Sequence, residues 1–496
     1  MYLNIAMLTG GLLSFIFVNS TCYSALRIQV SVPWLLELVV KHSDDIARQK
    51  NSLSAVEAST LSINSRLDSR FGMTISHFED DNERSNGSTL GKLSVQKASI
   101  NLSKSFSTGT MLSAEVNSSI NEQEMATVTP LVSQTNESKE SEFSVELRQS
   151  LLKNSFGHAH RASIDAAESA KLAKKHLVEE TIESYLEVLI DQYFTIWTAF
   201  NQLASSEERY KRELRRKKIY DRQYNRGFIE KIDILQIDSS ILSAEKNLSD
   251  AKQLISGLLI KLGTIVKMDL YNQYIGKKIS FKFALEKIDD VEKLCSNNRI
   301  KINSFISETY SNRIQSFNAK LAAISSNGKP EVYFATKITA NGIDDETKNS
   351  LSEASSFKHP QYLVSLGIDM FIGRSANQAD KLEALKSRSE NQILLAQEKA
   401  NLTSDWLETC NSLRMTSLKK QYISKKLDLD SERIKLLDQD FRLGKTDLGT
   451  LLQAEDTLTN TKSSLSNLSA KLFNTAWHLR KQSGQLRTFV SSAIGR

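Results

Sequence analysis

Few residues of this chain have the types and spacing that metal binding or catalysis requires. His158 and His160 are the closest histidine pair, and they stand at a predicted helix start without a third ligand nearby. A solvated helix start is therefore a better interpretation than a metal site. The sequence contains no Walker loop and no H-E-x-x-H, C-x-x-C or G-x-S-x-G pattern. We predict a protein that is not an enzyme and that binds no cofactor or metal.

The three cysteines also lack metal-type spacing. Cys410 follows Trp406 by four residues on a helical stripe, which favours a small buried hydrophobic residue, and Cys295 has no near partner in sequence. Cys22 ends an apolar segment, residues 5–25, that is typical of a secretory signal peptide.

The residues before Cys22 form a poor lipobox, so cleavage is favoured over a lipid anchor, with an uncleaved membrane helix as the alternative. No later stretch approaches the ~18 apolar residues that a spanning helix needs. If the mature chain lies in a membrane, strands must cross it.

The densest charge is the basic run at residues 209–218, RYKRELRRKK. The simplest interpretation is a solvated helix face; the alternatives are a docking surface for an acidic partner or a lining that attracts anions. Lys and Arg number 64 against 58 Asp and Glu, a formal net charge of +6. This near balance gives no reason to predict nucleic-acid binding.

Two segments of the chain align with each other and indicate an internal repeat. Each segment carries a glycine with an aromatic residue three positions before it and a Leu-Gln pair after it. The matched positions are Tyr224 with Phe441, Gly227 with Gly444, Leu235 with Leu452, and Gln236 with Gln453.

Each glycine follows about 70 residues that contain neither Gly nor Pro and could extend about 100 Å as one helix. Apolar residues recur there in heptads, as in Ile182, Leu189, Ile196 and Leu203, and the pattern continues beyond the glycine from Ile241. Each half is therefore predicted to contain a long coiled-coil helical hairpin with its tip near Gly227 or Gly444.

Alternating and β-branched residues before these helices predict strands at residues 71–79, 98–106, 111–119 and 143–151, and again at 331–340 and 362–371. In the last, Tyr362, Val364, Leu366, Ile368 and Met370 share one face. Such two-faced strands suit a transmembrane barrel, although a soluble sheet fits any one strand taken alone. Residues 80–91, 120–142 and 341–358 are polar and are expected to be exposed loops.

The order of helix, strands and glycine-tipped hairpin, repeated after a signal peptide, resembles the TolC family of outer-membrane channels. The resemblance is carried by Leu151 to Gly157 (LLKNSFG), by Tyr224, Gly227, Asp233, Leu235 and Gln236, and by Phe441, Gly444, Leu451, Leu452 and Gln453. It implies a homotrimer that shares one outer-membrane β-barrel and one periplasmic helical tunnel. It also implies a periplasmic adaptor, or membrane fusion protein, and an inner-membrane transporter as partners, with outer-membrane lipid around the barrel.

The resemblance places the candidate gate at the hairpin tips: Tyr224, Gly227, Asp233, Phe441, Gly444, Asp447, Thr450 and Gln453. The family often has an Asp six residues after the tip glycine; the first half keeps it as Asp233, and the second has Thr450. In the protein that names the family, two acidic residues on the second turn narrow the entrance. Here the matching positions, Thr450 and Gln453, are neutral, while Asp447, Glu455 and Asp456 lie nearby and could supply the charge from a shifted face.

The expected fold is mixed α and β in two repeats, residues 26–270 and 271–496, after a signal peptide at 1–25. Each repeat has a helix (34–67; 289–321), barrel strands (71–151; 331–371) and a long hairpin (157–263; 374–484). An additional strand pair around residues 107–110 departs from a four-strand contribution per subunit. The predicted function is a porin-like outer-membrane conduit of a tripartite efflux pump or type I secretion system in a Gram-negative bacterium. The alternative is a periplasmic helical scaffold or adaptor without a transmembrane barrel.

Overall fold

The computed structural model describes residues 26–80, 90–125, 134–276, 279–283, 285, 288–296, 304–370, 372–373, 375–443 and 445–494. The predicted signal peptide and Gly444 lie outside these residues. The chain forms two compact units, which are described separately. Unit 1 comprises Met1–Asp44, Val188–Leu294 and Leu413–Trp477; unit 2 comprises Asp45–Glu187, Cys295–Ser412 and His478–Arg496.

The two longest described helices, α3 (His158–Asn225) and α9 (Ser375–Arg442), contribute to both units, and each is 68 residues long. Because no Gly or Pro interrupts either run, the backbone hydrogen bonds continue from end to end. The two long helices predicted from the sequence are confirmed. Among the described residues, no helix has both the length and the apolar character that spanning a membrane requires.

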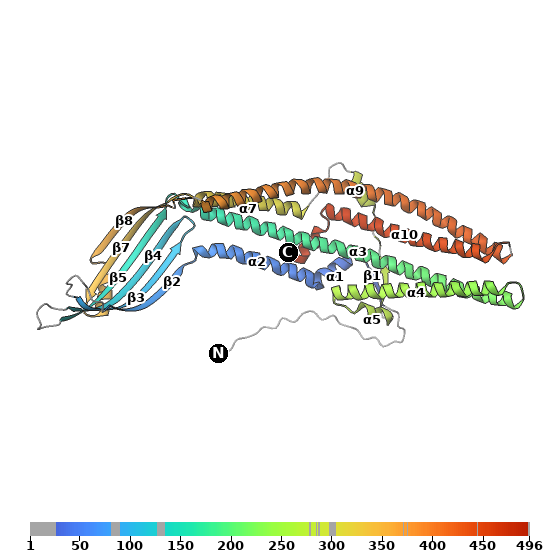
Figure 1. Cartoon of the computed structure of the whole chain (residues 1–496), viewed down its shortest axis with the longest axis horizontal. Coiled ribbons are helices and arrows are strands. Elements are labelled where there is room, and N and C mark those ends of the chain that lie inside the picture. The colour runs from blue at the N-terminus through green and yellow to red at the C-terminus, as the bar shows by residue number, and fades with distance from the viewer. Residues whose placement is uncertain are drawn as a thin grey trace. The chain divides into compact units, whose positions relative to one another are not determined.

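Unit 1 holds the ends of two helical hairpins, α3 with α4 (Lys231–Val266) and α9 with α10 (Leu448–Gln482) (Figure 1). Its core is the predicted heptad stripe: Leu203 on α3 packs with Leu248, Ile255 and Leu259 on α4. Unit 1 also contains α1 (Val32–His42), α5 (Leu270–Ile275) and most of α6 (Asp289–Ser296). A parallel pair of strands, β1 (Leu26–Val30) and β6 (Ile279–Phe283), was not predicted.

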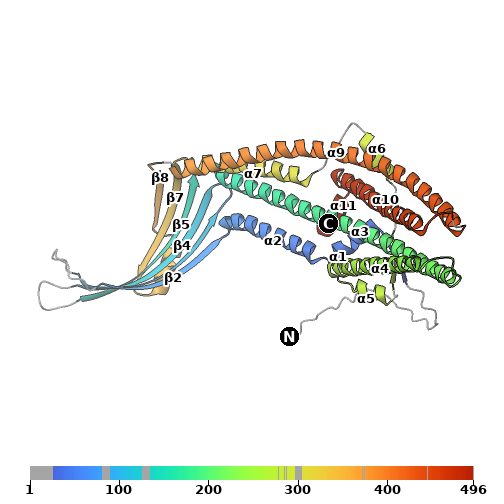
Figure 2. The ribbon, with the colours of Figure 1, turned by 45° about the vertical axis from the view of Figure 1, so that its right-hand side comes forward.

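Unit 2 is built on one antiparallel sheet in the order β2-β3-β4-β5-β7-β8. The strands lie side by side in both views of the chain (Figures 1 and 2). The strands are β2 (Arg70–Asp80), β3 (Leu90–Ser105), β4 (Thr110–Met125), β5 (Gln134–Ser150), β7 (Glu331–Asp344) and β8 (Pro360–Asp369). The predicted extra pair is present: β3 and β4 turn through Gly109, whose φ is +74°. The helices are α2 (Asp44–Asn64), α7 (Phe305–Asn327), α8 (Thr347–Ser355) and α11 (Arg487–Ile494), with short 3-10 turns at Ser65–Leu67 and Ser155–Gly157.

Several predicted boundaries were wrong. The expected loop at 120–142 is largely strand, because β4 runs to Met125 and β5 starts at Gln134, and the expected loop at 341–358 contains the end of β7 and all of α8. The expected helix at 34–67 is divided at Ser43. Polar side chains led to the loop predictions, but a sheet ladder is held by backbone groups, which every residue but proline supplies in full.

The cysteine interpretation was also wrong. Cys295, near the end of α6, and Cys410 of α9 form a disulfide across 115 residues of sequence. Cys410 is therefore not simply a small buried hydrophobic residue. Disulfides persist in oxidising compartments such as the bacterial periplasm and are rare in the cytosol. The bond is thus in keeping with a chain that is exported.

Candidate functional site

The sheet of unit 2 has two chemically different faces. Strand register assigns the side chains to faces, because residues paired across neighbouring strands point the same way. One face, called the apolar face below, is hydrophobic on all six strands. It comprises Phe71, Met73 and Ile75; Ala98, Ile100 and Leu102; Leu112, Ala114 and Val116; Phe143, Val145 and Leu147; Val332, Phe334 and Ile338; and Tyr362, Val364, Leu366 and Ile368.

The opposite face is polar and carries charges of both signs, including Lys97, Glu115, Glu146 and Lys337. Large side chains on the apolar face are well exposed on the single chain, with Phe71 at 67% and Leu366 at 73%. A sheet with one exposed apolar face and one polar face matches the wall of a membrane barrel.

The first hairpin tip turns at Gly227. Its φ of +75° lies in the left-handed region that glycine adopts without a Cβ clash, and its N–H donates to the carbonyl of Tyr224 at 2.9 Å. Tyr224 itself is 43% exposed. Asp233 accepts a hydrogen bond from the backbone N–H of Glu230 at 3.1 Å and so completes a capping box at the start of α4. The structure thus uses Asp233 to stabilise its own helix start.

The second tip precedes α10. Asp447 accepts hydrogen bonds from the Thr450 hydroxyl at 2.7 Å and the Thr450 backbone N–H at 2.8 Å. These two bonds, the hydroxyl first, hold the pKa of the Asp447 carboxyl below its usual range. Gln453 is exposed. Asp447 therefore caps the start of α10 from the position just before the helix, whereas Asp233 is the third residue of α4 and bonds back to the residue before that helix.

An apolar contact joins the two hairpins just behind these turns. Tyr220 of α3 stacks on Phe441 of α9, with ring centres 5.4 Å apart and planes within 2° of parallel. Ile237 of α4 and Leu448 of α10 are buried in the same cluster. Burial raises the pKa of the Tyr220 phenol, which therefore stays neutral at physiological pH. Tyr220 therefore joins Phe441 in a buried contact behind the tips.

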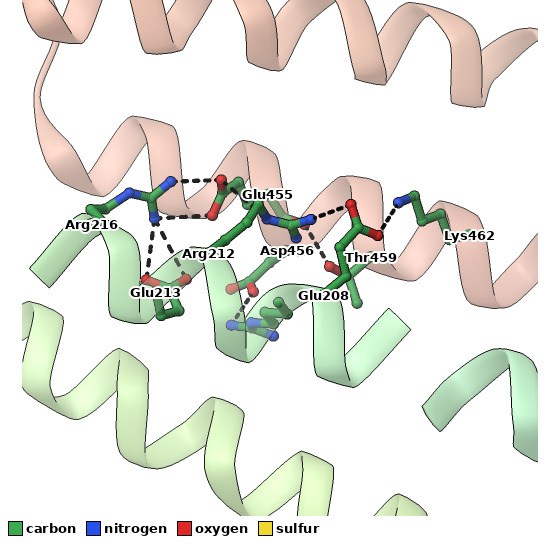
Figure 3. A network of polar contacts seen from close by, with 9 residues as sticks. Glu208, Arg212, Glu213, Arg216, Glu455, Asp456, Thr459 and Lys462 are labelled. Carbon is green, nitrogen blue, oxygen red and sulfur yellow. Dashed lines mark hydrogen bonds and ion pairs between the residues drawn. The ribbon is translucent and has the colours of Figure 1, made fainter. Parts of the chain in front are cut away.

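Ion pairs continue this contact along α3 and α10 (Figure 3). Arg216 donates to Glu455 through both terminal nitrogens, at 2.6 and 3.0 Å, and also lies 3.2 Å from Glu213. Arg209 pairs with Asp456 at 2.6 Å. The exposed fractions of the Arg216, Glu455 and Glu213 side chains are 11%, 5% and 1%. We call this group the tip clasp: Arg209, Arg212, Glu213, Arg216, Glu455 and Asp456.

The clasp corrects one interpretation of the sequence. Residues 209–218 are not a uniformly solvated helix face, because Arg209, Arg212 and Arg216, at i, i+3 and i+7, lie on one side of α3 and meet acidic residues of α10. Glu455 and Asp456 in turn pair with Arg216 and Arg209 of α3 within the chain. The i, i+3, i+7 spacing of the arginines was the signal in the sequence that could have revealed the clasp.

A second charged cluster lies in unit 2 around the α3 carboxylates Glu180, Glu183 and Glu187. Lys481 lies 2.8 Å from Glu187 and 3.7 Å from Glu180, and His478 also bonds Glu187. Burial opposes ionisation of Glu187, but hydrogen bonds from His478 and Lys481 lower its pKa to about 2. Burial and the neighbouring Glu180 raise the pKa of Glu183 to about 8. Glu183 is thus largely protonated at neutral pH.

Within the residues that the structure describes, no group of three or more His, Cys, Asp or Glu side chains could hold a metal ion. Gly444, the remaining predicted tip residue, lies outside the described residues. The structure therefore brings Phe441 and Tyr220 together, gives Asp233, Asp447 and Thr450 capping roles, and leaves Tyr224 and Gln453 exposed.

No protein-family model and no curated protein sequence matches the chain. Solved structures do match. The outer-membrane channel OprN aligns at TM-score 0.65 and 10% identity, over 91% of this chain and 89% of that one. The CmeC outer membrane channel of Campylobacter jejuni gives 0.66 and 11%, over 94% and 89%. The outer membrane protein VceC of Vibrio cholerae gives 0.66 and 11%, over 91% and 96%. The chain has the fold of the TolC family of outer-membrane channels.

Proposed function

We propose that this chain is the outer-membrane channel of a tripartite efflux pump or a type I secretion system, and that it works as a homotrimer. The observation that carries the proposal is the apolar face, which runs across all six strands of a sheet whose other face is polar. In a lipid bilayer the edges of an open sheet would leave backbone N–H and C=O groups without partners. Several copies must therefore pool their strands, and cyclic symmetry is the simplest closed arrangement.

In this proposal the hairpin ends in unit 1 form the periplasmic entrance, and the tip clasp holds the resting, closed state. The clasp and the Tyr220–Phe441 stack connect the α3–α4 hairpin to the α9–α10 hairpin. Opening would separate the two hairpins, and the buried pair between Arg216 and Glu455 would break. The channel itself supplies no energy, so the trigger for opening would come from an adaptor and an inner-membrane transporter.

A groove in unit 1 supports an adaptor as a partner. It has a volume of about 390 Å³ and lies between α3, α9 and α10. Trp197, Leu427 and Leu465 provide its apolar lining. Glu208 and Lys462 also line the groove and form an ion pair with each other. An amphipathic helix from a periplasmic adaptor fits such a lining, because it presents apolar anchors along one face and charge beside them.

The alternative is a periplasmic scaffold without a barrel, and fractionation separates the two functions. We expect the protein in the outer-membrane fraction, with heat-modifiable gel mobility, a detergent particle of about three mature chains, and ion conduction in planar bilayers. Recovery of a monomer from the soluble periplasmic fraction would refute the channel and favour the scaffold.

A further inference from the structure

The sheet has two more strands than the four per subunit expected for this family, and the apolar face includes them. β2 and β3 pair over Arg70 to Asp80, and β3 and β4 pair along nearly their full lengths. One transverse row through the ladder is hydrophobic on every strand: Phe71, Leu102, Ala114, Val145, Ile338 and Tyr362. Strands outside the membrane would not need this continuity.

We propose that each subunit contributes all six strands, so that three copies close an 18-stranded barrel with its seams between β2 of one copy and β8 of the next. The number of strands rests on the proposed trimer, since three times the six strands of one sheet gives eighteen. The partner at each sheet edge is thus a second copy of this chain.

The edges of the sheet support this closure. β2 and β8 are the outer strands, and Phe71, Met73 and Ile75 on β2 are as exposed as Tyr362, Val364 and Leu366 on β8. Every pair within the sheet is antiparallel, so the first and last strands run in opposite directions. β2 of one copy can therefore join β8 of the next as another antiparallel pair, which leaves no edge in the lipid.

A 12-stranded wall would require a different edge. β4 would have to pair with β8 of the neighbouring copy, although β4 already pairs with β3 on one side and β5 on the other. The ladder between β3 and β4 would have to open, and the apolar side chains of β2 and β3 would leave the lipid. The observed pairing therefore favours the wider barrel.

The strand number sets the width of the exit. With neighbouring strands about 4.8 Å apart and tilted by about 40°, eighteen strands enclose a ring about 36 Å across between backbones, against about 24 Å for twelve. The cross-section through which cargo leaves would be roughly doubled. The polar face, with Lys97, Glu115 and Lys337, would line this water-filled passage.

Cysteine cross-linking between subunits tests the seam directly. In a Cys22→Ser background, Met73→Cys on β2 is combined in turn with Tyr362→Cys, Val364→Cys, Leu366→Cys and Ile368→Cys on β8. A second series places Ala114→Cys on β4 with the same four partners. Neighbouring strands bring paired Cβ atoms within disulfide range, whereas two intervening strands do not. Met73→Cys with Leu363→Cys is the matched control, because Leu363 points to the opposite face.

We expect oxidation of purified trimers to give covalent dimers and trimers with at least one Met73→Cys combination, and with none of the Ala114→Cys combinations. Cross-linking from Ala114→Cys would overturn the 18-stranded barrel and leave a 12-stranded channel. Trimers that cross-link in neither series would also overturn it, because another seam would then close the wall. Failure to obtain any trimer would instead count against the proposed function itself.

Discussion

Removal of the central arginine of the tip clasp is the sharpest test of the proposed gate. Arg216 is the shared partner of Glu455 and Glu213, and all three side chains are nearly buried. Arg216→Met keeps most of the side-chain volume but leaves two carboxylates with Arg212, 3.8 Å from Glu455, as the nearest remaining cation of the clasp. We expect the closed state to lose most of the stabilisation that the ion pair between Arg216 and Glu455 contributes.

The magnitude follows from the burial of the pair. Breaking a buried ion pair by removing one partner costs about 3–5 kcal/mol, because the remaining charge is left uncompensated. Arg212 offsets part of this, so the low end, about 3 kcal/mol, is appropriate. Since 1.4 kcal/mol is a factor of ten, the ratio of open to closed tips should rise about 150-fold per subunit if opening breaks the pair.

Single-channel recording of purified trimers in planar bilayers measures this shift. The Arg216→Met channel should show larger or longer open events than the parent, and cells that carry it should become more sensitive to bulky antibiotics. Arg215→Met is the matched control, because Arg215 is the neighbouring basic residue and is exposed. The effects of Glu455→Leu and Arg216→Met on channel opening should not add in the double variant, as expected for two residues in contact.

Two results would refute this reasoning. If Arg216→Met forms trimers whose conductance and antibiotic exclusion equal those of the parent, the clasp does not hold the gate. If Arg215→Met opens the channel as strongly as Arg216→Met, the effect comes from net charge near the tip and not from the buried pair.

Three further predictions concern other parts of the chain. Cys295→Ser should lower the free energy of unfolding by about 2–5 kcal/mol and abolish the mobility difference between reducing and non-reducing gels; equal melting of variant and parent would show that the disulfide is dispensable. Glu183 has its pKa raised to about 8, so the free energy of unfolding should fall as pH rises from about 5 to 8, at up to about 1.4 kcal/mol per pH unit, and Glu183→Gln should flatten this dependence in thermal melts. Ser466→Trp, which fills the groove of unit 1, should weaken adaptor pull-down without loss of the trimer, whereas Asn467→Trp on the exposed side of α10 should leave it unchanged.

Much of the architecture was determined by patterns that are local in the sequence. The two runs without Gly or Pro became α3 and α9, and heptad residues such as Leu203 and Leu248 became the core between α3 and α4. Alternation located all six strands of the large sheet, and Gly227 formed the predicted turn with positive φ. Helix and strand periods repeat within a few residues, so a single sequence carries them.

Only the tertiary structure decided which distant residues meet. Cys295 pairs with Cys410, Arg216 with Glu455, and Tyr220 with Phe441. The strands β1 and β6 are five residues each and lie about 250 positions apart, too short and too distant for a local signal. In each case the partner is chosen by how helices and strands pack, and sequence spacing does not encode the charge or ring that a neighbouring element presents.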